Sequence, residues 1–260
     1  MRADVHHWDA VMRTWQRTRP QRLWRQHSDI VTEAMLERWL PHTRIERLLK
    51  TDLFDEAVHT GLCPMLARRA RQVIGIDLST RVAKAAGRPL ALASDVTSLP
   101  FCDGIFDVVV SNSTLDHFDS TDQIRVALDE IHRVIRPGGV LVLTLDNLSN
   151  PLIALRNRLP PHWIRRIGLV PYQVGATLGP QAVARMLDEV GFDLEQEDTL
   201  IHCPRFLAVA LLRMVEARRL RTVDQYLLRG LMAFERLKAW PTRFCTGHYV
   251  AVRAVRRRML

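Results

Sequence analysis

Residues 94–118, SDVTSLPFCDGIFDVVVSNSTLDHF, decide the fold of this 260-residue chain. At their centre, residues 106–111 (FDVVVS) form a nearly continuous apolar run in which the β-branched valine dominates. A parallel strand that is buried on both faces requires such a run. A dense polar cluster, residues 111–118, follows it directly. The stretch therefore predicts a buried strand whose end carries the polar side chains of a site.

The segments on either side repeat this pattern, because apolar strands alternate with amphipathic helices. Residues 120–135 predict a helix, since Ile124, Leu128 and Ile131 share one face. The alternation indicates an α/β fold with a Rossmann-like, doubly wound and mostly parallel sheet of seven strands. Right-handed crossovers then place a crevice at the carboxyl ends of the parallel strands. The strands are expected within residues 44–53, 72–76, 89–93, 106–111, 140–145, 192–202 and 249–255.

Two regions lie outside the alternation. Residues 7–40 carry apolar positions at helical spacing and predict two helices in an N-terminal segment, residues 1–43. The main domain is then residues 44–260. Beyond residue 150 the chain is first loop-rich and later helical, before its last strand. We expect residues 151–180 and a helical insertion, residues 206–240, to form lids on the substrate side.

Polar residues that follow the strands are the candidates for ligand binding. Asp77 ends the second strand, where an acidic residue can accept hydrogen bonds from both ribose hydroxyls of an adenosine. Asp95 follows the third strand and can accept from an adenine amino group, beside the apolar Val96. Asn112 and Ser113 end the fourth strand at the crevice. These positions predict an adenosine-containing ligand.

Three segments together resemble the class I S-adenosylmethionine-dependent methyltransferases, and specifically their type 11 branch. They are GIDLS at residues 75–79, the stretch at 94–118 and RVIRPGGVLVLTL at 133–145. The resemblance covers residues 44–150 well and 181–255 loosely. It implies methyl transfer from S-adenosylmethionine to a small-molecule or lipid-like metabolite. The cofactor-binding residues that it implies are Asp77, Leu78, Asp95, Val96, Asn112 and Ser113.

The chain departs from the family at its first motif, a glycine-rich turn after the first strand. Residues 48–57, LLKTDLFDEA, stand there instead, and the next glycine is Gly61. Because the cofactor carries an ammonium group and a sulfonium, carboxylates could still hold it. We expect Asp52 and Asp55, with Glu56 beside them, to do so. The alternative is a non-catalytic binding protein that keeps the methyltransferase fold.

The expected chemistry asks for alignment of nucleophile, methyl and sulfur in an in-line displacement. A base helps only where the nucleophile must lose a proton. His117 and Asp116 are the candidate catalytic residues, and Tyr172, Asp146 and His202 are further candidates for the same pocket. No metal is expected, because Cys63, Cys102, Cys203 and Cys245 are scattered without a CxxC pair.

Charge along the chain bears on the partners. The net charge is +9, divided as +4 over residues 1–50, −4 over 51–150 and +9 over 151–260. The basic third region favours an anionic acceptor. The arginines expected nearest to it are Arg156, Arg158, Arg165 and Arg166.

Two other partners stay open alternatives. An RNA substrate fits the basic flanks, but no RNA-binding module is recognisable and no signature for base amines follows the fourth strand. Residues 205–221 combine an apolar stretch with five arginines and could contact a membrane surface. Scattered cysteines and the absence of an apolar leader predict a cytoplasmic protein.

Overall fold

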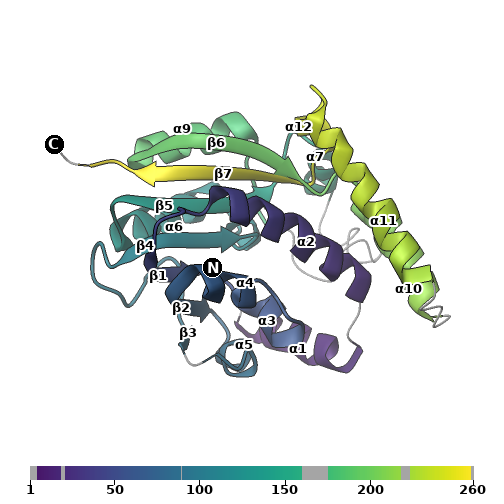
Figure 1. The fold of residues 1–260 in the computed structure, drawn as a ribbon, viewed down its shortest axis with the longest axis horizontal. Helices are drawn as coiled ribbons and strands as arrows, with labels where there is room; N and C mark the ends of the chain where they lie inside the picture. The colour runs from purple at the N-terminus through teal and green to yellow at the C-terminus, as the bar shows by residue number, and fades with distance from the viewer. Residues whose placement is uncertain (1–4, 19–20, 89, 160–174, 218–222, 259–260) are drawn as a thin grey trace.

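The computed structural model describes residues 5–18, 21–88, 90–159, 175–217 and 223–258. Their strands form one sheet in the order β3-β2-β1-β4-β5-β7-β6 (Figure 1). β1 to β5 are parallel, β7 is antiparallel to β5, and β6 is antiparallel to β7. This mostly parallel, seven-stranded sheet confirms the predicted fold. The strands are β1 Ile45–Lys50, β2 Ala70–Asp77, β3 Ala91–Ala93, β4 Phe106–Asn112, β5 Ile135–Asp146, β6 Phe192–Leu200 and β7 Tyr249–Arg256.

Helices cover both faces of the sheet (Figure 1). Local signals explain how several of them begin and end. Ser120 caps one helix by accepting a hydrogen bond from the Gln123 backbone N–H, and Gly191 ends another at a φ of 109°. The helices are α1 Val5–Thr18, α2 Arg22–Trp39, α3 Phe54–Val58, α4 Cys63–Arg69, α5 Thr80–Ala85, η1 Leu115–His117, α6 Thr121–Val134, α7 Pro151–Arg158, α9 Pro180–Val190, α10 Arg205–Ala217, α11 Asp224–Phe234, η3 Glu235–Ala239 and α12 Arg243–Thr246.

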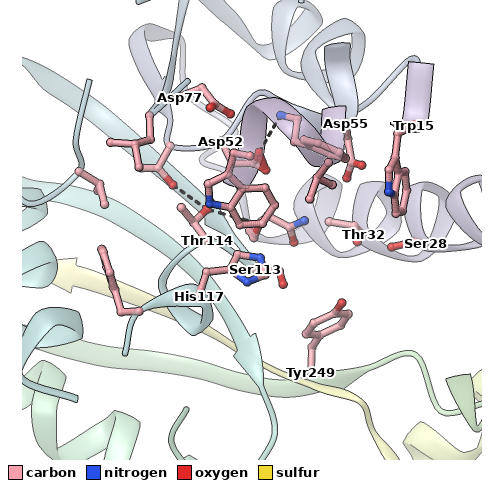
Figure 2. A pocket seen from close by; sticks show the side chains of 18 of the residues that line it. Trp15, Ser28, Thr32, Asp52, Asp55, Asp77, Ser113, Thr114, His117 and Tyr249 are labelled. Atoms are coloured by element: carbon pink, nitrogen blue, oxygen red, sulfur yellow. Dashed lines mark hydrogen bonds between the residues drawn. The ribbon is translucent and has the colours of Figure 1, made fainter. Parts of the chain in front are cut away.

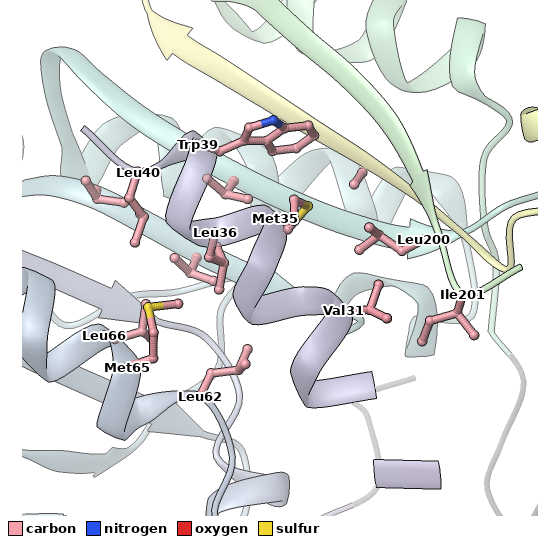
Figure 3. Close-up of a cluster of buried hydrophobic side chains, with 14 of the residues drawn as sticks. Val31, Met35, Leu36, Trp39, Leu40, Leu62, Met65, Leu66, Leu200 and Ile201 are labelled. Atoms are coloured by element: carbon pink, nitrogen blue, oxygen red, sulfur yellow. The ribbon is translucent and has the colours of Figure 1, made fainter. Parts of the chain in front are cut away.

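Helix α2 belongs to the core of the sheet. Figure 3 shows its apolar face, which carries Val31, Met35, Leu36 and Trp39, among side chains of α4 and the end of β6. Met35 and Leu36 are fully buried. At roughly 1.5–3 kcal/mol for each fully buried side chain, this contact fixes α2 on the sheet. The N-terminal segment therefore has no separate core at α2, although the sequence divides at residue 43.

The region after β5 differs from the expected loop. Residues 151–158 form helix α7, because Asn150 accepts a hydrogen bond from the Leu152 backbone N–H at 2.9 Å and Pro151 starts the first turn. Residues 160–174 lie outside the described residues. The expected helices before the last strand are α10 and α11, and both pack against α2. Among the described helices, none has the length and apolar character needed to cross a bilayer.

Candidate functional site

One pocket lies at the carboxyl ends of β1 to β4, where the topology predicts a crevice (Figure 2). The ends of these four strands meet there with helices α1 and α2, which lie above them. All eight residues predicted to bind the cofactor line this pocket, namely Asp52, Asp55, Asp77, Leu78, Asp95, Val96, Asn112 and Ser113.

Asp77 is held by backbone groups at the end of β2. One carboxylate oxygen accepts from the Ser79 N–H at 2.8 Å and the other from the Leu53 N–H at 3.3 Å. Each oxygen keeps a second lone pair for a further donor, such as a ribose hydroxyl. Burial raises the pKa of Asp77 to about 7, and the Asp52 carboxylate adds to the rise. Asp77 can therefore change its charge near neutral pH.

A buried ion pair stands where the family has its glycine-rich turn. Lys50 Nζ lies 2.9 Å from Glu56 Oε2, and Lys50 also donates to the Asp52 carbonyl. Glu56 Oε1 accepts from the backbone N–H groups of Leu62 and Cys63, at the start of α4. Burial alone would raise the pKa of Glu56, but the Lys50 ammonium outweighs it and holds this pKa below its usual range. The Glu56 carboxylate thus binds Lys50 and the backbone of the neighbouring turn, and it does not line the pocket, in contrast to our expectation.

The other two carboxylates of this loop do face the pocket (Figure 2). Asp52 accepts a hydrogen bond from the Phe54 N–H at 2.7 Å, and Asp55 forms an ion pair with Arg25 of α2. Gly75 allows the loop to sit this close, because a Cβ at that position would overlap the Leu53 side chain. Packing of Leu53 over β2 thus takes over part of the positioning that glycines give elsewhere in the family.

The ends of β3 and β4 complete the cofactor side. Asp95 Oδ1 accepts from the Thr97 N–H at 2.9 Å and from the Thr97 hydroxyl at 2.7 Å. Asn112 Oδ1 accepts from the Thr144 hydroxyl at 2.9 Å. Ser113 has a φ of 50°, a left-handed conformation that is uncommon for serine. Such strained residues are concentrated at functional sites.

The two candidate catalytic residues have different surroundings. His117 lines the pocket, with its ring 4.8 Å from that of Trp8. Asp116 is 3% exposed and lies behind the pocket wall. Its Oδ2 accepts from the Ser113 hydroxyl at 2.9 Å and from the Asp146 N–H at 3.1 Å. Burial raises the pKa of Asp116, and the Asp146 carboxylate adds to the rise. The structure thus brings His117, and not Asp116, to the pocket surface.

The N-terminal helices cover the pocket, a position that the sequence pattern does not predict. Trp8, Val11 and Trp15 of α1 line it, and so do Arg25, Ser28 and Thr32 of α2. In the sequence, tryptophans interleave with arginines in these two helices. This spacing alone does not predict which part of the sheet the helices cover. The described parts of the two expected lids, 151–180 and 206–240, contribute no lining residue. Arg205 and Tyr249 complete the wall there.

The other candidate residues named from the sequence lie outside the pocket wherever the structure describes them. Arg156 is buried against Asp146 at 2.5 Å, and Arg158 is exposed outside the pocket. His202 is buried beside Thr246, at 2.8 Å from its hydroxyl. Burial raises the pKa of the Cys203 thiol to about 12, so this cysteine is inert. Arg165, Arg166 and Tyr172 lie outside the described residues.

The donor set of the pocket fits S-adenosylmethionine. Four carboxylates line it (Asp52, Asp55, Asp77 and Asp95), and they suit a ligand that carries an ammonium and a sulfonium group. Phe54 and the indole rings of Trp8 and Trp15 add aromatic faces, which attract cations.

Comparison with known proteins agrees with this geometry. Residues 59–143 match the family model of a methyltransferase domain. A malonyl-[acyl-carrier protein] O-methyltransferase of Coxiella burnetii is 31% identical over 118 residues, which cover 44% of this chain and 40% of that protein. A demethylmenaquinone methyltransferase of Corynebacterium kroppenstedtii is 34% identical over 117 residues, which cover 43% of this chain and 48% of that protein. The match thus spans less than half the length of either relative.

Solved structures show the same fold. The [4+2]-cyclase SpnF superimposes with a TM-score of 0.59 at 19% identity, covering 90% of this chain and 82% of that one. S-adenosylmethionine is the cofactor of the matched family, and its predicted contacts converge on one pocket here. Residues 59–143 are therefore a methyltransferase domain, and the described chain has the fold of the class I S-adenosylmethionine-dependent methyltransferases.

Proposed function

We propose that this protein transfers a methyl group from S-adenosylmethionine to a small-molecule or lipid-like acceptor. The observation that carries the proposal is the convergence of the eight predicted cofactor residues on one pocket. Asp77 would hold the ribose, Asp95 the adenine amino group, and Asp52 with Asp55 the ammonium group. The bound cofactor supplies a methyl group that its sulfonium has already activated.

The names of the relatives and a pocket residue not assigned to the cofactor support the proposed acceptor class. The names of the two curated relatives include malonyl-[acyl-carrier protein] and demethylmenaquinone, which supports a small or lipid-like acceptor. His117 is the proposed base for an acceptor that must lose a proton, because it is the candidate that lines the pocket. Asp116 would act on it indirectly, through Ser113 and the turn that both residues share. Exposed thiols at Cys102 and Cys245 suit the proposed cytoplasmic location.

The replaced glycine-rich turn favours a second candidate, a binding protein without transferase activity. SpnF, a cyclase by its name, supports the idea that this fold carries other chemistry. The two candidates differ in whether label from S-adenosylmethionine reaches any acceptor, and this can be measured with a metabolite extract. Absence of transfer alongside tight cofactor binding would favour the binding protein.

Asp77→Ala tests the cofactor site. Loss of a charged acceptor for two hydroxyls should weaken binding of S-adenosylmethionine by about tenfold or more. Calorimetric titration measures this, and circular dichroism checks that the variant is folded. Asp129→Ala, at an exposed position on α6, is the matched control and should bind like the wild type. Equal affinity in folded Asp77→Ala would refute the site, and no binding by the wild type would refute the proposed function.

A further inference from the structure

Charge is divided between the walls of the pocket. The four carboxylates follow β1, β2 and β3, whereas the arginines that line it, Arg25 and Arg205, belong to helices. Arg25 is paired with Asp55, at the end assigned to the cofactor ammonium. Arg205 lies at the other end, because it donates to the hydroxyl of Tyr249 at 3.4 Å. Tyr249 begins β7 and pairs with Asp146 at the end of β5, away from β2 and β3.

The guanidinium of Arg205 is held in place by aromatic and polar neighbours. Its guanidinium carbon lies 5.6 Å from the centre of the Trp24 ring, and one guanidinium nitrogen donates a hydrogen bond to the Tyr249 hydroxyl. The nearby Asp146 carboxylate is already engaged by Arg156 at 2.5 Å. Burial would raise the pKa of Asp146, but Arg156, His248 and Arg205 hold it below its usual range, so the Arg205 guanidinium lies near this carboxylate as well as in the pocket wall.

Hydroxyl groups line the wall of the pocket between Asp55 and Tyr249 (Figure 2). Ser28 and Thr32 are one turn apart on α2 and both line the pocket, and Tyr249 lies across from them (Figure 2). Hydroxyls and a guanidinium are the donors that bind carboxylate or phosphate oxygens, and the planar guanidinium can bind two oxygens at once. An anionic group could not sit at the other end, where four carboxylates would repel it.

We propose that Arg205, with the hydroxyls of Tyr249, Ser28 and Thr32, binds an anionic group of the acceptor, a carboxylate or a phosphate. The inference rests on the proposed function and adds the acceptor's orientation: its anion lies at the β7 end and its reacting group faces the cofactor. The positive charge that selects the acceptor then comes from the start of α10, whereas the described Arg156 and Arg158 do not line the pocket.

The test compares benzoate and phenyl phosphate with benzamide, a neutral analogue of benzoate. Ligand-observed NMR titrations are run on the protein with and without S-adenosylhomocysteine. Both anions should bind the wild type about tenfold or more tightly than benzamide, as one charged hydrogen-bonding contact provides. Their relative affinity tells whether the site prefers a carboxylate or a phosphate.

Two variants locate the preference. In Arg205→Gln, the affinity for the anions should exceed that for benzamide by less than about twofold. Tyr249→Phe should lower this ratio of affinities about threefold, because the guanidinium loses one hydrogen-bond partner. Arg229→Gln, at an exposed position on α11, is the control and should keep it. A wild type without preference for the anions, or a folded Arg205→Gln variant that keeps the preference, would overturn the inference. Failure of the proposed function shows separately, as loss of S-adenosylhomocysteine binding by the wild type.

Discussion

At the scale of single residues, Asp77 links cofactor binding to pH. Its pKa of about 7 means that its carboxyl is half protonated at neutral pH in the ligand-free protein. Only the ionised form accepts from both ribose hydroxyls, so affinity should fall as pH falls from 8 to 6, by about tenfold at one unit below the pKa. Calorimetric titrations over this range measure the effect, and Asp77→Asn should remove most of it. A pH-independent affinity in the wild type would contradict the assignment.

The raised pKa of Asp77 also has a consequence for stability. An unfolded aspartate titrates near 3.8, so the stabilising effect of protonated Asp77 is complete below that pH and is lost as pH rises through 7. Asp77→Asn should therefore raise the melting temperature relative to the wild type more at pH 8 than at pH 5. Thermal unfolding at the two pH values measures this difference.

The residue scale also shows what the sequence could and could not predict. Asp77 and Asp95 were predictable, because a residue that follows a parallel strand must lie at the carboxyl edge of the sheet. Glu56 and Asp116 were not, because each is adjacent in the chain to a pocket residue, and the sequence does not show which of the two neighbours is buried. That burial depends on Lys50 and Asp146, which the spacing of the sequence does not bring into view.

At the scale of elements, the loop after β1 depends on the Lys50–Glu56 pair. Lys50→Met leaves the Glu56 carboxylate buried without its partner and should lower the free energy of unfolding by about 3 kcal/mol or more. Glu56→Gln should cost less, since its amide oxygen can still accept from the Leu62 and Cys63 N–H groups. Denaturant unfolding of both single variants and the double variant measures the coupling. Additive effects would mean that the pair does not act as a unit.

Helix α1 is the element that we expect to respond most to a bound cofactor. Its 14 residues cover the pocket, and a helix of this length is marginal without tertiary contacts. Trp8, Val11 and Trp15 would pack against a bound cofactor, so S-adenosylhomocysteine should slow amide hydrogen exchange in residues 8–18. Mass spectrometry of peptides measures this, with α9, which does not line the pocket, as the internal control. Unchanged exchange in α1 would show that it does not close over the ligand.

The strands and helices were predictable as elements, because their apolar periodicity is local. The cover of the pocket was not predictable. That α1 and α2 form it depends on packing between residues far apart in the chain. Residues 151–158 were also missed as a helix, although Asn150-Pro151 is a recognisable helix start.

At the scale of the whole molecule, a group of arginines lies at the amino end of the sheet. A groove at the amino ends of β1 and β5 is lined by six of them: Arg44, Arg136, Arg253, Arg256, Arg257 and Arg258. Asp107 and Glu195 neutralise part of this charge, by pairing with Arg136 and Arg253. The cofactor pocket lies at the opposite, carboxyl end of the same strands. With seven residues in β4 at roughly 3.3 Å each, the two sites are separated by about 20 Å.

This separation predicts how the protein responds to RNA. A chain of net charge +9 should bind RNA weakly through this groove, with an affinity that falls steeply with salt. The groove and the cofactor pocket lie at opposite ends of the strands, so we expect total RNA to bind away from the cofactor and to take up no label from S-adenosylmethionine. Filter binding and label incorporation measure the two effects. Arg257→Gln with Arg258→Gln should lower the salt dependence by about one unit for each phosphate that the variant no longer binds, whereas Arg205→Gln should leave it unchanged. Labelled RNA would instead make the RNA methyltransferase the better assignment.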